Sequence, residues 1–160
     1  MFRKGCDAGN PDCAVAYADC LRRGEGTAKD TEKALSVLSG AASKGFPSAA
    51  IELAYWKEKG YCVGKDREAA FAEYKNLAES GIPMARYHLG RCYLDGIGTV
   101  EDRKEALTQF EMSDMAGCPY GTFGVARCTL AGVKGTAGSG AALLEKAFEE
   151  GCDDAALMLA

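Results

Sequence analysis

Eight cysteines give this 160-residue chain its richest potential for side-chain chemistry. Such a number is typical of a disulfide framework, of a metal site, or of small hydrophobic residues in a core. A zinc site needs several ligands close together, yet the chain has a single histidine and no C-x-x-C pair. We therefore predict no metal site, and the spacing of the cysteines has to decide between the other two possibilities.

Two further features are similar to catalytic or cofactor-binding motifs but lack the partners that those motifs need. His88 stands between Tyr87 and Leu89, and no serine or cysteine nucleophile is identifiable beside it. The segment 135–140 spaces its outer glycines like a phosphate loop, but Ala141 occupies the place of the phosphate-binding lysine. The sequence accordingly predicts no catalytic residue, no cofactor and no enzymatic activity.

A glycine repeat with a period of 36 residues organises the chain. Two series have this spacing, namely Gly24, Gly60, Gly96 and Gly132, and Gly9, Gly45, Gly81 and Gly117. A period of about 20 to 50 residues indicates stacked supersecondary units, none of which can bury its apolar face alone. The sequence therefore predicts a solenoid, and this architecture favours partner binding as the function.

Each repeat is expected to form two helices. In the third repeat Ala85, Leu89 and Tyr93 recur every four residues, which places them on one face of a first helix. The second helix is expected to begin after an aspartate that caps the amides of its first turn, and to end at a left-handed glycine. The three capping aspartates are Asp30, Asp66 and Asp102.

The third repeat carries a family resemblance in the residues Ala85-Arg-Tyr-His-Leu89-Gly90-Arg-Cys-Tyr93-Leu-Asp-Gly96-Ile-Gly98-Thr-Val-Glu-Asp102, followed by Lys104-Glu-Ala106 and Ala116-Gly117. This motif resembles the Sel-one-like repeat, a relative of the tetratricopeptide repeat. The resemblance implies an all-α fold, a right-handed α-α superhelix of antiparallel helix pairs in which small residues such as Gly90 occupy helix crossings. Cys62 departs from the motif at the second loop glycine.

The resemblance covers nearly the whole chain. It implies one domain over residues 1–160, with units at about 12–47, 48–83, 84–119 and 120–153 and partial units at both ends. Because the chain begins and stops inside a repeat, we expect a longer parent protein. The amino terminus shows no secretory signal, but such a signal could have been removed, so the sequence leaves the compartment open.

The repeat register separates the cysteines into two groups. Cys20, Cys92 and Cys128 occupy one repeat position, where Trp56 stands in the second repeat. Equivalent helices lie about 8–10 Å apart, beyond the roughly 7 Å Cα limit for a disulfide. We therefore expect these three thiols to be reduced and buried.

A different interpretation applies to Cys6 and Cys13, which lie on either side of the turn 9–11. Cysteine-rich secreted relatives link corresponding helix ends by disulfides, so the resemblance implies a candidate bridge between Cys6 and Cys13. Reduced core thiols are the alternative.

By resemblance to tetratricopeptide packing, the first helices line a concave groove. Aromatic, apolar and charged side chains alternate there, a mixture typical of protein interfaces. Burial between helices is an equal alternative for Ile51, Tyr87 and Phe123. The groove residues are Ile51, Tyr55, Glu58 and Lys59 in the second repeat, Met84, Tyr87, Arg91, Leu94 and Asp95 in the third, and Tyr120, Phe123, Arg127 and Leu130 in the fourth.

These residues predict a scaffold that holds a peptide or protein segment in the groove. Arg91 and Arg127 share a repeat position, so together they could grip an acidic segment, unless both pair with local carboxylates such as Asp95. Two other functions remain open. Some cysteine-rich relatives have been linked to binding or hydrolysis of β-lactam compounds, and the chain could also be a structural spacer in a larger protein.

Composition narrows the partner class. The net charge of −4 and the isoelectric point near 5.1, without a basic stripe, argue against nucleic acid as the main ligand. No apolar run is long enough to cross a bilayer, so we predict no membrane insertion.

Overall fold

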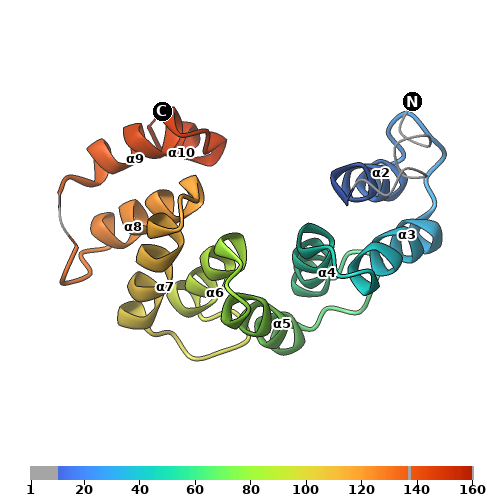
Figure 1. Cartoon of the computed structure of the whole chain (residues 1–160), viewed down its shortest axis with the longest axis horizontal. Helices are drawn as coiled ribbons and strands as arrows, with labels where there is room; N and C mark the ends of the chain where they lie inside the picture. The colour runs from blue at the N-terminus through green and yellow to red at the C-terminus, as the bar shows by residue number, and fades with distance from the viewer. Residues whose placement is uncertain (1–10, 137, 160) are drawn as a thin grey trace. The chain divides into compact units, whose positions relative to one another are not determined.

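The computed structural model describes residues 11–136 and 138–159 and is all-α within them (Figure 1). The helices of this part are α2 (Pro11–Arg23), α3 (Thr31–Ser43), α4 (Pro47–Lys59), α5 (Arg67–Glu79), α6 (Pro83–Asp95), α7 (Arg103–Met115), α8 (Pro119–Leu130), α9 (Gly140–Glu149) and α10 (Asp153–Leu159).

Successive helices form antiparallel pairs, as the repeat predicted. The first helices α2, α4, α6 and α8 all begin at a proline, and these prolines are 36 residues apart. Proline suits the first turn because the amide it lacks would have no partner there. The second helices α3, α5, α7 and α9 follow, so the helical hairpin is the repeating element.

The chain forms two compact units, and their boundary falls inside α5. Unit 1 ends at Glu73 and unit 2 begins at Tyr74. Trp56 and Leu38 are fully buried in the core of unit 1, whereas Phe110 is fully buried in that of unit 2. Each unit therefore has a hydrophobic core of its own.

The predicted aspartate caps are confirmed. Asp30 Oδ1 accepts a hydrogen bond from the amide of Lys33 at 2.9 Å, and Asp66 Oδ1 accepts one from Ala69 at 2.9 Å. Asp102 Oδ1 accepts from two amides, those of Lys104 at 3.1 Å and of Glu105 at 3.0 Å. These carboxylates satisfy amides that have no partner within their own helix.

One loop position keeps the repeat conformation without glycine. Gly26 and Gly98 have φ angles of 69° and 68°, and Cys62 at the same position has 59°. The left-handed region costs an L-residue about 1–2 kcal/mol because Cβ approaches the following carbonyl oxygen. The departure from the motif at Cys62 therefore introduces strain while the loop keeps its shape.

Two glycines make room for the ring of Phe110, a fully buried side chain on α7. A Cβ atom on Gly90 of α6 would lie 2.7 Å from Phe110 Cε1, and one on Gly124 of α8 would lie 2.1 Å from Cδ1. Both distances are far below a normal contact. Gly90 is thus confirmed at a close helix crossing, and Gly124 forms a second crossing.

Candidate functional site

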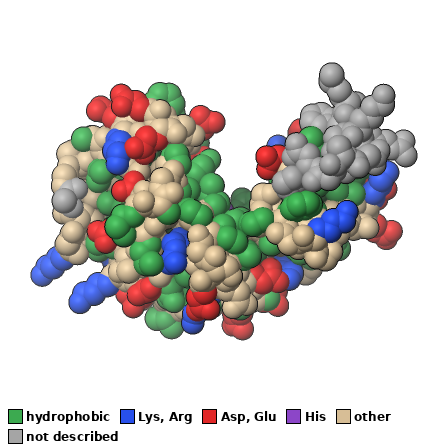
Figure 2. Space-filling view, in the orientation of Figure 1, with side chains coloured by type: hydrophobic (Ala, Val, Ile, Leu, Met, Phe, Trp, Pro, Cys, Tyr) green, Lys and Arg blue, Asp and Glu red, His purple; other side chains and the backbone are tan. Residues whose placement is uncertain are grey.

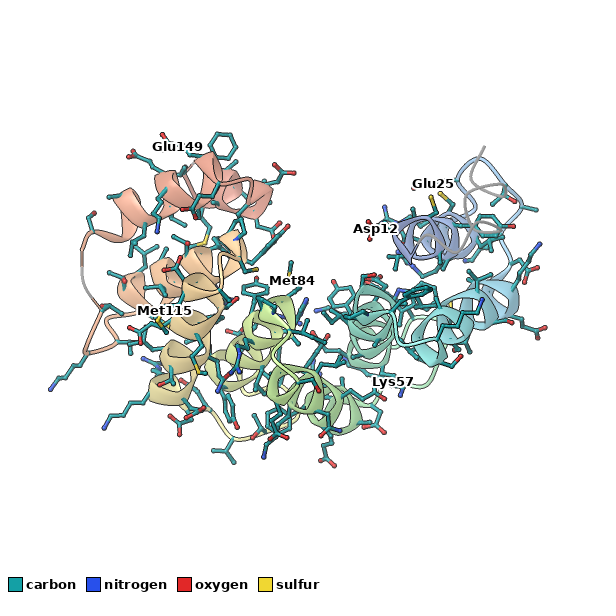
Figure 3. All side chains as sticks on the ribbon, in the orientation of Figure 1. Asp12, Glu25, Lys57, Met84, Met115 and Glu149 are labelled. Carbon is teal, nitrogen blue, oxygen red and sulfur yellow. The ribbon has the colours of Figure 1, made fainter. Side chains whose placement is uncertain are left out.

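The first helices of unit 1 line an open surface pocket of about 530 Å³. It lies along α2 and α4 and also takes in Tyr61 from the loop after α4; Asp12, labelled in Figure 3, belongs to its α2 side. We call it the α2–α4 pocket. Its lining residues are Asp12, Val15, Ala16, Asp19, Arg22, Arg23, Ser48, Glu52, Tyr55 and Tyr61.

The α2 side of this pocket occupies the repeat positions that were predicted to face a groove. Moving Met84, Tyr87, Arg91, Leu94 and Asp95 back by two periods of 36 gives five lining residues, namely Asp12, Val15, Asp19, Arg22 and Arg23. The groove predicted from the sequence covered the second, third and fourth repeats only. One further shift of 36 from the second repeat gives four of these residues, and Asp12 follows from Met84 by two shifts.

A single carboxylate holds both arginines of the pocket. Asp19 Oδ1 accepts hydrogen bonds from Arg22 Nε at 3.0 Å and from Arg22 Nη2. Asp19 Oδ2 forms an ion pair with Arg23 Nε at 2.8 Å. The Arg22 guanidinium carbon also lies 4.4 Å from the centre of the Tyr61 ring, a cation–π contact. The two cations are thus engaged within the pocket wall.

Glu52 connects the pocket to the core. Its Oε1 accepts a hydrogen bond from Nε1 of the fully buried Trp56 at 2.7 Å. Burial raises the pKa of the Glu52 carboxyl, and the Asp19 charge adds to the rise. The Trp56 hydrogen bond and the charges of Arg22 and Arg23 oppose it without cancelling it. The surroundings of Glu52 therefore do not fully replace the hydration that its carboxylate loses on burial.

Of the four residues proposed for the second repeat, only Tyr55 lines this pocket. Its ring packs edge-on against Tyr61, with centroids 6.1 Å apart, and Lys59 Nζ lies 5.3 Å from its centre. Ile51 is buried, which agrees with the alternative that it packs between helices and does not face a groove. Glu58 is only 2% exposed and pairs with Lys59 at 3.1 Å, because a buried carboxylate needs a compensating charge.

The aromatic residues of unit 2 belong mostly to its core. Tyr87 and Phe123 are each 6% exposed, which again agrees with the interhelical alternative. The Tyr87 ring centre lies 5.3 Å from that of Tyr120 and 5.8 Å from that of Phe110. Burial raises the pKa of the Tyr87 phenol to about 12, although the Arg91 and Arg127 charges oppose this rise.

The surface beside these aromatic residues of unit 2 is apolar, and Asp95 neutralises the charge of Arg127 on it. Met84, Leu94 and Tyr120 are partly buried against the core of unit 2, and Leu130 is 56% exposed. Hydrophobic side chains gather on the side of unit 2 where α6 and α8 lie (Figure 2). Arg127 Nη2 donates to Asp95 Oδ1 at 3.0 Å and to Oδ2 at 3.2 Å. For Arg127 the alternative of a local carboxylate partner is therefore confirmed.

Comparison with known proteins gives the family. The family model of the Sel1 repeat, the Sel-one-like repeat, matches residues 11–45, 47–81 and 83–108. The chain belongs to the Sel1 repeat family. Comparison with curated protein sequences gave no match.

Two solved structures share the Sel1 repeat fold. A Sel1 repeat protein from Oxalobacter formigenes superposes with a TM-score of 0.72 at 21% identity, over 95% of this chain and 63% of that one. A protective antigen present in uropathogenic Escherichia coli strains, displaying an SLR fold, gives 0.74 at 24% identity, over 99% and 34%. The chain thus spans less than two thirds of the length of either protein.

The cysteines of this Sel1 repeat protein follow the register only in part. Cys92 and Cys128 are buried, and burial raises the pKa of the Cys128 thiol to about 11, so that it is unreactive at neutral pH. The prediction of a buried Cys20 was wrong, since this side chain is partly exposed. Its helix α2 packs mainly on α3 and α4 within the described residues, which leaves one side less covered.

The proposed bridge between Cys6 and Cys13 involves Cys6, which lies outside the described residues. In the described segments no group of three or more histidine, cysteine or acidic residues is arranged to hold a metal ion. Among the helices described for this Sel1 repeat protein, none is long and apolar enough to cross a membrane.

Proposed function

We propose that this Sel1 repeat protein is a non-catalytic scaffold whose first helices bind an extended segment of another protein. The observation that carries the proposal is the α2–α4 pocket, because it lies at the repeat positions expected to face a partner. Solenoids recognise partners through surfaces built from equivalent positions of successive repeats.

The chemistry of the pocket supports a protein segment as its ligand. Its volume of about 530 Å³ could accommodate one or two side chains. Its lining combines two tyrosines with two arginines, the residue types enriched at the energetic centres of protein interfaces. The ion pairs around Asp19 hold the charged side chains in place before a partner arrives, which lowers the entropy cost of binding.

Unit 2 offers a second contact surface of a different kind. Tyr120, Met84, Leu94 and Leu130 would supply apolar contacts, and an acidic segment could replace Asp95 as the partner of Arg127. Such an exchange would cost little, since the Asp95 and Arg127 side chains are 38% and 24% exposed and surface ion pairs contribute at most about 1 kcal/mol.

Random-peptide display on the purified protein tests the proposal. Peptides selected for binding would be measured by fluorescence anisotropy against Tyr55→Ala in unit 1, Tyr120→Ala in unit 2, and Met115→Ala as the control. Met115 is 78% exposed on the second helix α7 and lies outside both surfaces. We expect one of the tyrosine variants to weaken binding about tenfold or more, a loss of about 1.4 kcal/mol, with an unchanged helical spectrum.

The opposite pattern would refute this assignment. Peptides that bind both tyrosine variants with unchanged affinity, but lose affinity for Met115→Ala, would place recognition on the second helices.

A further inference from the structure

Large apolar side chains are exposed on both α9 and α10 of unit 2, two helices that pack against each other. Single apolar side chains are common at protein surfaces, whereas a group of them on neighbouring helices is typical of an interaction site. We define the α9–α10 surface as the large exposed apolar residues together with two exposed glutamates of α9. Its members are Glu145, Phe148, Glu149, Leu157, Met158 and Leu159.

Leu157 continues a row of residues that is buried in the two preceding repeats. Because α8 begins at Pro119 and α10 at Asp153, the step between these two helices is 34 residues. This step makes Leu157 the equivalent of Phe123. Phe123 and Tyr87, one repeat earlier, are each 6% exposed and their ring centres lie 6.4 Å apart, whereas Leu157 is 80% exposed. First helices therefore stack through this position, and Leu157 leaves the same contact open.

Two positions that are engaged on α7 are exposed on α9. By the same step of 34 residues from Pro119 to Asp153, α9 carries Ala141 and Phe148 where α7 carries Leu107 and Asp114. Leu107 is buried, and Asp114 accepts a hydrogen bond from the Thr122 hydroxyl of α8. Ala141 and Phe148 are instead apolar and exposed. α9 therefore adds apolar area to that of α10.

The negative charge of the chain is concentrated on these two helices. Residues 140–159 contain five acidic residues and one lysine, a net charge of −4, which equals the net charge of the whole chain, so the other residues are neutral overall. Figure 2 shows acidic side chains next to hydrophobic ones over α9 and α10. The exposed acidic residues are Glu145, Glu149, Glu150, Asp153 and Asp154. Such a surface complements a basic partner, and like-charge repulsion opposes its pairing with a second copy of itself.

We propose that the α9–α10 surface binds a basic amphipathic helix of a partner protein. A helix fits this surface because Tyr87, at the position equivalent to Leu157, is covered by Phe123 of the following first helix α8. The apolar face of the bound helix packs on Leu157 and Phe148, and its lysine or arginine side chains pair with the glutamates of α9. This surface lies outside the two surfaces assigned above to an extended segment, so the inference goes beyond the proposed function and does not depend on it.

Designed helical peptides test the proposal on the purified protein. The basic probe is fluorescein-labelled KLAKKLAKLAKKLAK-amide, whose leucines lie on one face of the helix. An acidic twin replaces every lysine by glutamate, and a shuffled peptide keeps the composition but spreads the leucines around the helix. Fluorescence anisotropy measures the affinity of each peptide at low and at physiological ionic strength. We expect saturable binding of the basic probe alone, weakened by salt because its charge contacts are exposed.

A matched pair of apolar variants localises the binding. Leu157→Gln removes the most exposed apolar side chain of the α9–α10 surface, and we expect it to weaken the basic probe about tenfold or more. Val100→Gln makes the same kind of change at an exposed residue outside the surface, between α6 and α7, and should leave the affinity unchanged. Because both side chains are exposed, both variants should keep the helical spectrum of the parent protein.

A matched pair of double variants tests the contribution of charge. Glu145→Gln combined with Glu149→Gln removes two charges from the surface and should weaken the basic probe roughly threefold to tenfold at low salt. Glu32→Gln combined with Glu79→Gln removes two charges from exposed positions on α3 and α5 and should leave the affinity unchanged.

Several outcomes would overturn the inference. They are no saturable binding of the basic probe, equal binding of the acidic or the shuffled peptide, or an affinity that neither Leu157→Gln nor the Glu145→Gln and Glu149→Gln pair reduces. A dimer of the protein alone in sedimentation equilibrium, lost in Leu157→Gln, would also overturn it, because a second copy would then occupy the surface. The proposed function is judged separately, by whether display-selected peptides lose affinity for the Tyr55→Ala or Tyr120→Ala variants.

Discussion

Replacing Gly124 by alanine should destabilise unit 2, because the space beside this glycine is filled by Phe110. The added Cβ would lie 2.1 Å from Phe110 Cδ1 and 2.4 Å from Cγ, whereas ordinary contact begins at 3.4 Å. The ring would have to move by the difference of 3.4 and 2.1, about 1.3 Å. The same edge of the ring faces Gly90 at the other crossing, so this movement disturbs α6 as well as α8.

The expected cost is that of overpacking a rigid core. Inserting one methyl group into such a site typically costs about 1–3 kcal/mol, and the fully buried Phe110 has no room to adopt another rotamer without displacing neighbours. Alanine is about 1 kcal/mol better than glycine inside a helix, which offsets part of this cost. We expect a net loss of up to about 2 kcal/mol in the free energy of unfolding.

Urea denaturation followed by far-ultraviolet circular dichroism measures this loss. Gly40→Ala on α3 is the matched control, because a Cβ there meets nothing within 4 Å, and it should stabilise by about 0.5–1 kcal/mol. In a Phe110→Leu background the cost of Gly124→Ala should shrink by about 1 kcal/mol, which is the coupling between the two sites. An unfolding free energy for Gly124→Ala equal to or above that of the parent, or additive double variants, would refute the close crossing.

Four further outcomes are expected. Cys62→Gly should raise the unfolding free energy by up to about 1 kcal/mol by relieving the left-handed strain, whereas Cys62→Val should lower it; a loss in the glycine variant, measured in urea, would contradict this. Asp102→Ala, which removes a cap with two bonds, should cost about 1 kcal/mol and more than Asp30→Ala, which removes one; a reversed order of melting temperatures would disagree. Tyr87 has its ordinary pKa of 10.0 in the unfolded chain but a pKa of about 12 in the folded chain. Because the unfolded chain releases this proton first, the unfolding free energy should fall as the pH rises from the lower value to the higher. In alkaline denaturation the Tyr87→Phe variant should lose roughly 2–3 kcal/mol less unfolding free energy than the parent protein. An equal pH dependence of the two proteins would count against the buried phenol. Nitrocefin should not be turned over by the purified protein in an absorbance assay, and turnover would revive the β-lactam alternative.

Helix boundaries could be predicted from the sequence because local chemistry determines them. Asp30, Asp66 and Asp102 cap helices through their own carboxylates, and those glycines of the 36-residue series that lie in the described residues adopt positive φ angles that other residues rarely tolerate. Neither feature depends on distant parts of the chain. The same local logic located Cys62 as an exception, although only the structure shows that its backbone keeps the left-handed conformation.

The site was harder to predict because a repeat position does not determine exposure. Glu58 and Leu130 are equivalent in register, yet the first is 2% and the second 56% exposed. Arg127 and Asp95 pair across 32 residues, which requires the spacing of α6 and α8 and not only their sequences. The α2–α4 pocket was missed for a simpler reason, since the register had not been extended to α2.

The equivalence of the first-helix positions has a consequence for how such a protein can change. The residue at one position is Asp19, Tyr55, Arg91 or Arg127 in successive repeats, while the glycines and prolines that shape the hairpins recur. Stacking and surface chemistry therefore depend on different residues. A variable row of this kind can be rewritten one repeat at a time without redesigning the backbone, so the fold is a natural template for engineering new specificity.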